Sequence, residues 1–124
     1  MGNDFKDLIV YKKAFAMAME IYRISKSFPS EEKYSLTDQV RRSSRSVCSN
    51  LAESYRKRQY RAHFLSKISD ADMENSETEV WIDFALRCNY ITIDAHKELI
   101  DKSTEVGRML SYMTLHPERF EGKR

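Results

Sequence analysis

The stretch from Gln39 to Glu53 constrains the fold most strongly, because its apolar and charged residues recur with the period of an α-helix. At about 100° per residue, one side of this helix collects apolar and small side chains, namely Leu36, Val40, Ser43, Val47, Leu51 and Tyr55. The opposite side collects polar and cationic side chains, namely Arg42, Arg45, Ser49 and Arg56. The stretch therefore predicts a helix that packs through one face and presents guanidinium groups, which bind phosphate or carboxylate bidentately, on the other.

Turn-forming residues are scarce along the whole chain, which has 3 Gly and 2 Pro among 124 residues. A many-stranded sandwich or barrel needs more of them, so the predicted fold class is all-α. The length is that of one ordinary domain, residues 1–124, with a helix break expected near Gln59. Apolar periodicity predicts helices over about residues 8–28, 36–58, 60–88 and 93–115, followed by a charged tail at 116–124.

Local signals mark the ends of these helices. Pro29 ends the first helix, because the residue before a proline is pushed out of the α region. We expect Ser35 or Thr37 to cap the second helix, Asn89 to end the third in a left-handed conformation, and Thr92 to cap the fourth. Short connections favour antiparallel neighbours, which predicts an up-down-up-down four-helix bundle.

The net charge of +2 conceals an uneven distribution of charge along the chain. Residues 33–67 contain nine Lys or Arg and only two carboxylates. Residues 70–79 then contain five carboxylates and neither Lys nor Arg. The basic segment can bind a polyanion, or it can pair with the acidic segment of another subunit, and the sequence leaves both interpretations open.

Two polar residues, Asn75 and Glu79, fall on the otherwise apolar face of the third predicted helix. A buried carboxylate needs a partner, because an unpaired buried charge costs several kcal/mol. Arg41 or Arg42 of the neighbouring helix is the natural candidate. We therefore predict a structural ion pair between Glu79 and one of these arginines, in preference to a catalytic role for Glu79.

The residue types that carry catalysis or bind metals are present but scattered. His63, His96 and His116 lack ligand spacing, no Glu-x-x-His pair of a diiron bundle occurs, and the chain has no Gly-rich phosphate loop. Cys48 lies near arginines that can lower the pKa of a thiol, but its helical position favours a small core residue. The sequence therefore predicts a protein that is not an enzyme and that has no metal site and no cofactor.

Two observations bear on the cellular compartment. Cys48 and Cys88 lie far apart without a paired spacing, which favours free thiols in a reducing cytoplasm. The longest apolar run, residues 14–19, is far too short to span a membrane. We expect a cytoplasmic protein that does not associate with membranes.

Several segments resemble a bacterial family, the four-helix-bundle proteins of ribosomal RNA intervening sequences, over about residues 5–115. The second predicted helix carries the family's signature in Gln39, Arg41-Arg42, Ser46 and Asn50-Leu51-Ala52-Glu53. The first helix matches at Phe5, Asp7-Leu8 and Val10-Tyr11, and the turn after it matches at Phe28-Pro29. The third helix and its exit match at Glu77, Glu79, Ala85 and Tyr90-Ile91. The resemblance implies a four-helix bundle assembled into a homo-oligomeric ring, typically a pentamer. A related protein is the accessory protein of diversity-generating retroelements, which suggests RNA or an RNA–protein complex as the partner.

Nucleic-acid binding is the leading functional hypothesis. The expected phosphate contacts are the cationic side chains of Arg42, Arg45, Arg56, Lys57, Arg58 and Arg61. Tyr60 is an expected stacking group for a base. The alternative is an oligomeric scaffold that binds a protein partner through Trp81, Phe84 and the acidic segment without binding RNA or DNA. A third interpretation is that Trp81, Phe84 and Tyr90 merely cover one end of the bundle.

Overall fold

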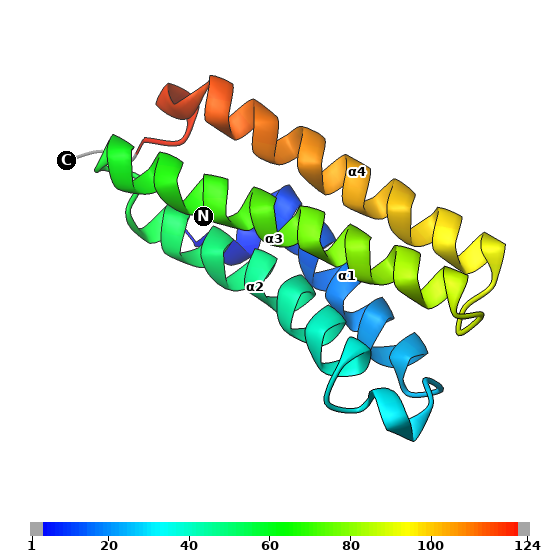
Figure 1. Cartoon of the computed structure of the whole chain (residues 1–124). Helices are drawn as coiled ribbons and strands as arrows, with labels where there is room; N and C mark the ends of the chain where they lie inside the picture. The colour runs from blue at the N-terminus through cyan, green and yellow to red at the C-terminus, as the bar shows by residue number, and fades with distance from the viewer. Residues whose placement is uncertain (1–3, 122–124) are drawn as a thin grey trace.

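The computed structural model describes residues 4–121, and four α-helices account for most of them (Figure 1). These helices are α1 (Ile9–Ser25), α2 (Leu36–Arg56), α3 (Arg61–Arg87) and α4 (Ile93–Leu115). Three short 3₁₀ helices accompany them, namely η1 (Phe5–Asp7), η2 (Ser30–Glu32) and η3 (Pro117–Arg119). Residues 4–121 contain no strand, so the all-α prediction is confirmed.

The helix ends follow the local signals in most places. Asn89 has a positive φ of 63°, and the Thr92 hydroxyl accepts a hydrogen bond from the backbone N–H of Ala95 at 3.1 Å, as predicted. The predicted helix over residues 8–28 is too long, because α1 ends at Ser25 and the following amides form tighter i to i−3 hydrogen bonds up to Phe28. The end of the predicted tail, residues 122–124, lies outside the described residues.

The cap of α2 differs from the prediction. Neither Ser35 nor Thr37 accepts a hydrogen bond from the first backbone amides of the helix through its side-chain oxygen. Instead, the Glu32 carboxylate accepts from the backbone N–H of Leu36 at 3.3 Å and from the Ser35 hydroxyl at 2.6 Å. A carboxylate is favourable at this position, because the amino end of a helix carries a partial positive charge.

The connections between helices lie at alternate ends of the molecule (Figure 1). The connection between α2 and α3 lies at one end, and the connections from α1 to α2 and from α3 to α4 lie towards the other. A hydrogen bond of 2.8 Å from the Tyr90 hydroxyl to Glu32 joins these last two connections. At the opposite end, the rings of Phe64 and Phe120 stack at 6.0 Å.

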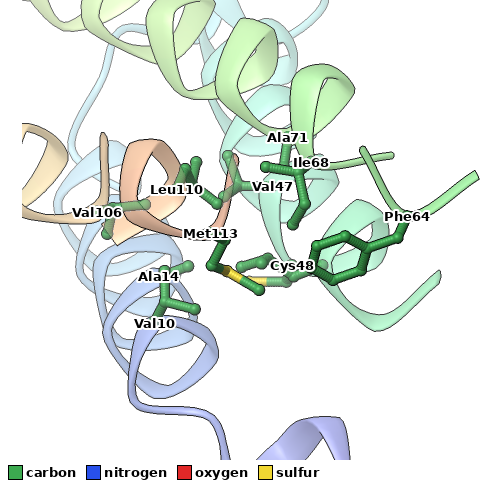
Figure 2. Close-up of a cluster of buried hydrophobic side chains, with 11 residues drawn as sticks. Val10, Ala14, Val47, Cys48, Phe64, Ile68, Ala71, Val106, Leu110 and Met113 are labelled. Carbon is green, nitrogen blue, oxygen red and sulfur yellow. The ribbon is translucent and has the colours of Figure 1, made fainter. Parts of the chain in front are cut away.

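Two apolar clusters fill the space between the helices. The larger cluster draws on all four α-helices (Figure 2) and consists of Val10, Ala14, Val47, Cys48, Leu51, Phe64, Ile68, Ala71, Val106, Leu110 and Met113. The smaller cluster lies further along the helices and consists of Met17, Ile21, Val40, Ile82 and Leu99. Within α1, the Phe15 side chain is 49% exposed, whereas Met17 is fully buried.

A layer of buried polar side chains separates the two apolar clusters along α2, α3 and α4. Its members are Ser43, Ser44, Asn75, Thr78 and Ser103. The hydroxyls of Thr78 and Ser43 are hydrogen bonded at 2.8 Å, and the Asn75 amide donates to the Ser103 carbonyl at 2.9 Å. No described buried side-chain N or O lacks a hydrogen-bond partner, so this layer joins three helices at one register without an unsatisfied group.

Candidate nucleic-acid interface

An open groove of about 610 Å³ runs along the outer face of the first half of α2. Cations at successive helical turns and the preceding connection line it together with smaller polar groups: Lys33, Tyr34, Thr37, Asp38, Arg41, Arg42, Arg45, Ser46 and Ser49. Four cations and a single carboxylate make its charge strongly positive. We call this feature the basic groove.

Two arginines of the basic groove, Arg41 and Arg45, are held by uncharged partners. Their guanidinium carbons lie over the Tyr22 ring, 4.8 Å and 5.6 Å from its centroid, and Arg41 Nε also donates to the Ser25 hydroxyl at 2.8 Å. Cation–π contacts and a neutral acceptor orient a guanidinium without cancelling its charge. Neither arginine has an ion pair with any residue in 4–121, so both charges are available to an anionic ligand.

Arg42 differs from its neighbours because carboxylates of α3 already neutralise it. It forms ion pairs with Glu74, at 3.4 Å, and with Glu77, and it also donates to Gln39 at 3.3 Å. Arg42 lines the basic groove, but two carboxylates balance its charge, and its contact with phosphate stays a prediction.

The predicted ion pair between Glu79 and Arg41 or Arg42 is wrong. The Glu79 carboxylate accepts a hydrogen bond of 2.6 Å from the Ser103 hydroxyl of α4. Glu74 and Glu77 are three residues apart and share the side of α3 that faces α2, whereas Glu79 is turned towards α4. Arg42 does form ion pairs with carboxylates of α3, but these are Glu74 and Glu77, on a different side of α3 from Glu79.

The remaining predicted contacts lie around the turn between α2 and α3, at the far end of α2. Arg42 and Arg56 are fourteen positions apart, which is about 21 Å along a helix, so the predicted residues form two separate groups. The members of this second group, which we call the turn cluster, are Arg56, Lys57, Arg58, Tyr60 and Arg61.

Within the turn cluster, the arginines differ in their partners. Arg61 is ion-paired to Glu121, with its Nε at 2.7 Å from the carboxylate. Arg58 stacks on the Tyr55 ring at 4.0 Å and donates to the Tyr55 carbonyl, and Arg56 lies 5.7 Å from the Phe5 ring centroid. Lys57 has no ion pair within residues 4–121. The turn cluster is thus cationic, and two of its members line a hollow of about 320 Å³ with residues of α2, α3 and η1: Arg56 and Lys57, with Phe5, Ala52, Glu53, His63 and Lys67.

Tyr34 and Lys33 also line the basic groove, although neither was predicted as a site residue from the sequence. Tyr34 is the most exposed large aromatic side chain described, at 84%, and the Lys33 ammonium lies 5.3 Å from its ring centroid. Both come from the connection that precedes α2, where no helical periodicity assigns a face. The one sequence signal that would have indicated Tyr34 is the presence of an aromatic residue inside a short polar connection.

Metal ligation and the reactivity of Cys48 can be judged from the described residues. No group of three or more His, Cys, Asp or Glu within 4–121 could hold a metal ion. Burial raises the pKa of the Cys48 thiol to about 11, which favours the protonated, unreactive form. Cys48 is therefore a core residue, as its helical position predicted. No helix in the described part of the chain is long and apolar enough to cross a membrane.

These features define an all-α protein of four helices with a basic groove on the outer face of its second helix. The chain belongs to the 23S rRNA-intervening sequence protein family, whose model matches residues 6–112. The family resemblance stated from the sequence is thus confirmed.

A solved structure from the S23 ribosomal protein family supports the fold. It is the crystal structure of a protein with unknown function from Bacteroides thetaiotaomicron VPI-5482, and it is similar to this chain with a TM-score of 0.78 and 30% sequence identity. The match covers 86% of this chain and 95% of that one. No curated protein matches the chain.

Proposed function

We propose that the protein binds RNA through the basic groove. The observation that carries this proposal is the set of three cations, Lys33, Arg41 and Arg45, that line one groove and have no ion pair with any residue of 4–121. Phosphate groups are the ligands that such a set of charges favours. The name of the family, which refers to an intervening sequence of 23S ribosomal RNA, supports RNA as the polyanion.

The turn cluster is the second part of the proposed interface. Arg56 and Lys57 retain their charge and lie near the end of the same helix as the basic groove. A strand that follows α2 would meet the groove first and the turn cluster about 20 Å further on. Phosphate contacts at both sites would make the affinity depend steeply on salt concentration.

The proposal includes an assembly and assigns no reaction. We propose an antiparallel up-down-up-down bundle that forms a homopentameric ring, as the family resemblance implies. Five copies of a weak phosphate-binding groove on one particle would raise the apparent affinity for a long RNA through avidity. A cytoplasmic location is part of the proposal, because ribosomal RNA resides there and Cys48 and Cys88 are free thiols.

Fluorescence anisotropy of labelled RNA and DNA oligonucleotides tests this proposal, with native mass recorded for each protein sample. We expect binding to weaken steeply with salt, and Arg45→Glu to weaken it about tenfold or more, since it removes one favourable charge and adds a repulsive one. Arg108→Glu is the matched control, because it makes the same charge change at an exposed position of α4.

Two results would contradict the proposal. One is the absence of RNA and DNA binding at low salt, which would favour the alternative of a protein-binding scaffold. The other is an equal loss of binding in Arg45→Glu and Arg108→Glu, because a general charge effect would then explain the data without the groove.

A further inference from the structure

A second hollow, of about 390 Å³, lies beside the basic groove. It is formed by the start of α2, the connection before it and the last turns of α3. Three aromatic rings line it, namely Tyr34, Trp81 and Phe84. The other lining residues are the polar Glu32, Ser35 and Gln39 and the smaller or apolar Leu36 and Cys88. We call it the aromatic hollow.

Tyr34 and Phe84 of the hollow are exposed, whereas Trp81 is half-buried. Trp81 and Phe84 lie with their ring centroids 6.0 Å apart and their planes at 36°. The indole N–H of Trp81 donates to Glu77 at 3.1 Å, which fixes the ring, while the Phe84 side chain is 54% exposed. Tyr90 does not line the hollow, because it packs on Phe28 at 5.5 Å and covers the end of the bundle.

The aromatic hollow adjoins the basic groove. Tyr34 lines both. The Glu77 carboxylate accepts from Trp81 of the hollow and from Arg42 of the groove, so the two sites share a fixed polar link. Gln39 strengthens this link, because its side-chain oxygen accepts from Arg42 while the residue lines the hollow.

The polar groups of the hollow favour an uncharged ligand. Glu32 is engaged by three donors, namely the Ser35 hydroxyl, the Tyr90 hydroxyl and the Leu36 amide, and its pKa is lowered by these hydrogen bonds, that from Ser35 most. These donors orient the carboxylate and occupy its acceptor positions, so it needs no hydrogen-bond donor from a ligand. The Gln39 oxygen is occupied by Arg42, which leaves its NH₂ group to donate to an acceptor in the hollow.

We propose that the aromatic hollow binds an unpaired nucleobase of an RNA strand whose phosphates lie in the basic groove. A base has a flat apolar face that stacks on aromatic rings and edge acceptors that an amide N–H can reach. Paired bases are enclosed in their own stack, so the hollow selects single-stranded RNA. The inference rests on the proposed function and adds the class of RNA and a base-binding site to it.

Trp81 is a built-in probe for this site, because it is the single tryptophan of the chain. Its fluorescence is recorded while a short single-stranded RNA, the matching RNA duplex and an abasic strand with the same number of phosphates are added. We expect the single strand to quench or shift the emission, and the abasic strand to bind without this change. Anisotropy of the same labelled strands reports binding independently.

A pair of variants completes the test. Phe84→Ala is expected to weaken binding of the single strand about tenfold and to leave the abasic strand unaffected. Met73→Ala is the matched control, because Met73 is an exposed apolar residue of α3 outside the hollow, and it is expected to change neither.

The two proposals fail in different ways. If no strand binds in the anisotropy measurement, the proposed function and this inference both fail. A different result would overturn this inference alone: the single strand and the abasic strand bind equally, Trp81 emission does not respond, and Phe84→Ala has no effect. In that case the groove binds RNA but the hollow does not bind a base. Tighter binding of the duplex than of the single strand would also overturn the inference.

Discussion

Whether an arginine is available to a ligand depends on its partners, and neighbouring arginines of α2 differ in this respect. Arg42 is neutralised by Glu74 and Glu77, whereas Arg41 and Arg45 lie against the Tyr22 ring. All three line the basic groove. A count of charges along the sequence therefore overstates the contribution of Arg42 and says nothing of the aromatic residue that orients the other two.

Ser103 provides a prediction at this scale, because one fully buried hydroxyl serves two acceptors. It lies 2.6 Å from the Glu79 carboxylate and 3.2 Å from the Asn75 side-chain oxygen. Ser103→Ala removes the donor and leaves both acceptors without it, which is expected to lower the free energy of unfolding by about 1–3 kcal/mol. Urea unfolding followed by circular dichroism measures this change.

Ser111→Ala is the control for this prediction, because Ser111 is an exposed residue of the same helix. Its effect is expected to stay within about 0.5 kcal/mol. Equal stabilities of Ser103→Ala and the parent protein would mean that the polar layer contributes little to the stability of the bundle.

Glu32 joins the connection between α1 and α2, in which it lies, to the connection between α3 and α4. Its carboxylate caps α2 through Leu36 and accepts from Tyr90 of the connection between α3 and α4. The hydrogen bond to Glu32 and partial burial raise the pKa of Tyr90 to about 12, and hydrogen bonds from Ser35 and Tyr90 lower the pKa of Glu32. One carboxylate thus joins a helix end to a second connection.

A pH dependence of stability follows from the lowered pKa of Glu32. Because the folded state favours the ionised carboxylate, its stabilisation is present above the ordinary pKa of 4.5 and is lost as the pH falls through the lower folded value. For Tyr90 the stabilisation is present below its ordinary pKa of 10.0 and is lost as the pH rises towards about 12. Thermal melting of Glu32→Gln at about pH 6 and about pH 3 is expected to change less with pH than melting of the parent.

Glu31→Gln is the matched control for the acid measurement. Glu31 is an exposed neighbour in the same 3₁₀ helix, so its substitution is expected to leave the acid dependence close to that of the parent. An identical pH dependence in Glu32→Gln and the parent would contradict the role assigned to this carboxylate.

The sequence predicted best those helix ends that depend on a single residue at or beside the end. The left-handed Asn89 and the capping Thr92 act within one turn, so their effect is readable from local order. The end of α1 was less predictable, because the turns after Ser25 tighten before Pro29. The Glu79 partner was mispredicted because periodicity gives a face of α3 but does not say which helix that face meets.

The same reasoning explains which parts of the candidate site were predictable. Arg42 and Arg45 follow from the helical period of α2, and both line the basic groove. Tyr34 comes from a connection, and Tyr22 comes from a different helix, so neither has a periodic signal that relates it to the groove. The position of the aromatic hollow beside the groove depends on the packing of α3 against α2, which the sequence does not encode locally.

At the scale of the whole molecule, stability and binding draw on different surfaces of the same helices. The buried faces of α2, α3 and α4 carry two apolar clusters with a polar layer between them. The outer face of α2 and the adjoining part of α3 carry the basic groove and the aromatic hollow. Charge-reversing substitutions in the groove are therefore expected to alter binding without unfolding the bundle.

The most direct test of the account is to locate RNA on the protein by photo-cross-linking. A single-stranded RNA containing 4-thiouridine is irradiated with the protein, and the modified peptides are identified by mass spectrometry after trypsin digestion. Cleavage after Lys and Arg releases residues 34–41, with Tyr34, and residues 68–87, with Trp81 and Phe84.

The account predicts cross-links concentrated in these two peptides. Their yield is expected to fall markedly in Arg45→Glu and to stay unchanged in Arg108→Glu. Cross-links concentrated instead in α4, for example in residues 109–119, or an unchanged pattern in Arg45→Glu, would contradict the claim that the basic groove is the RNA-binding surface.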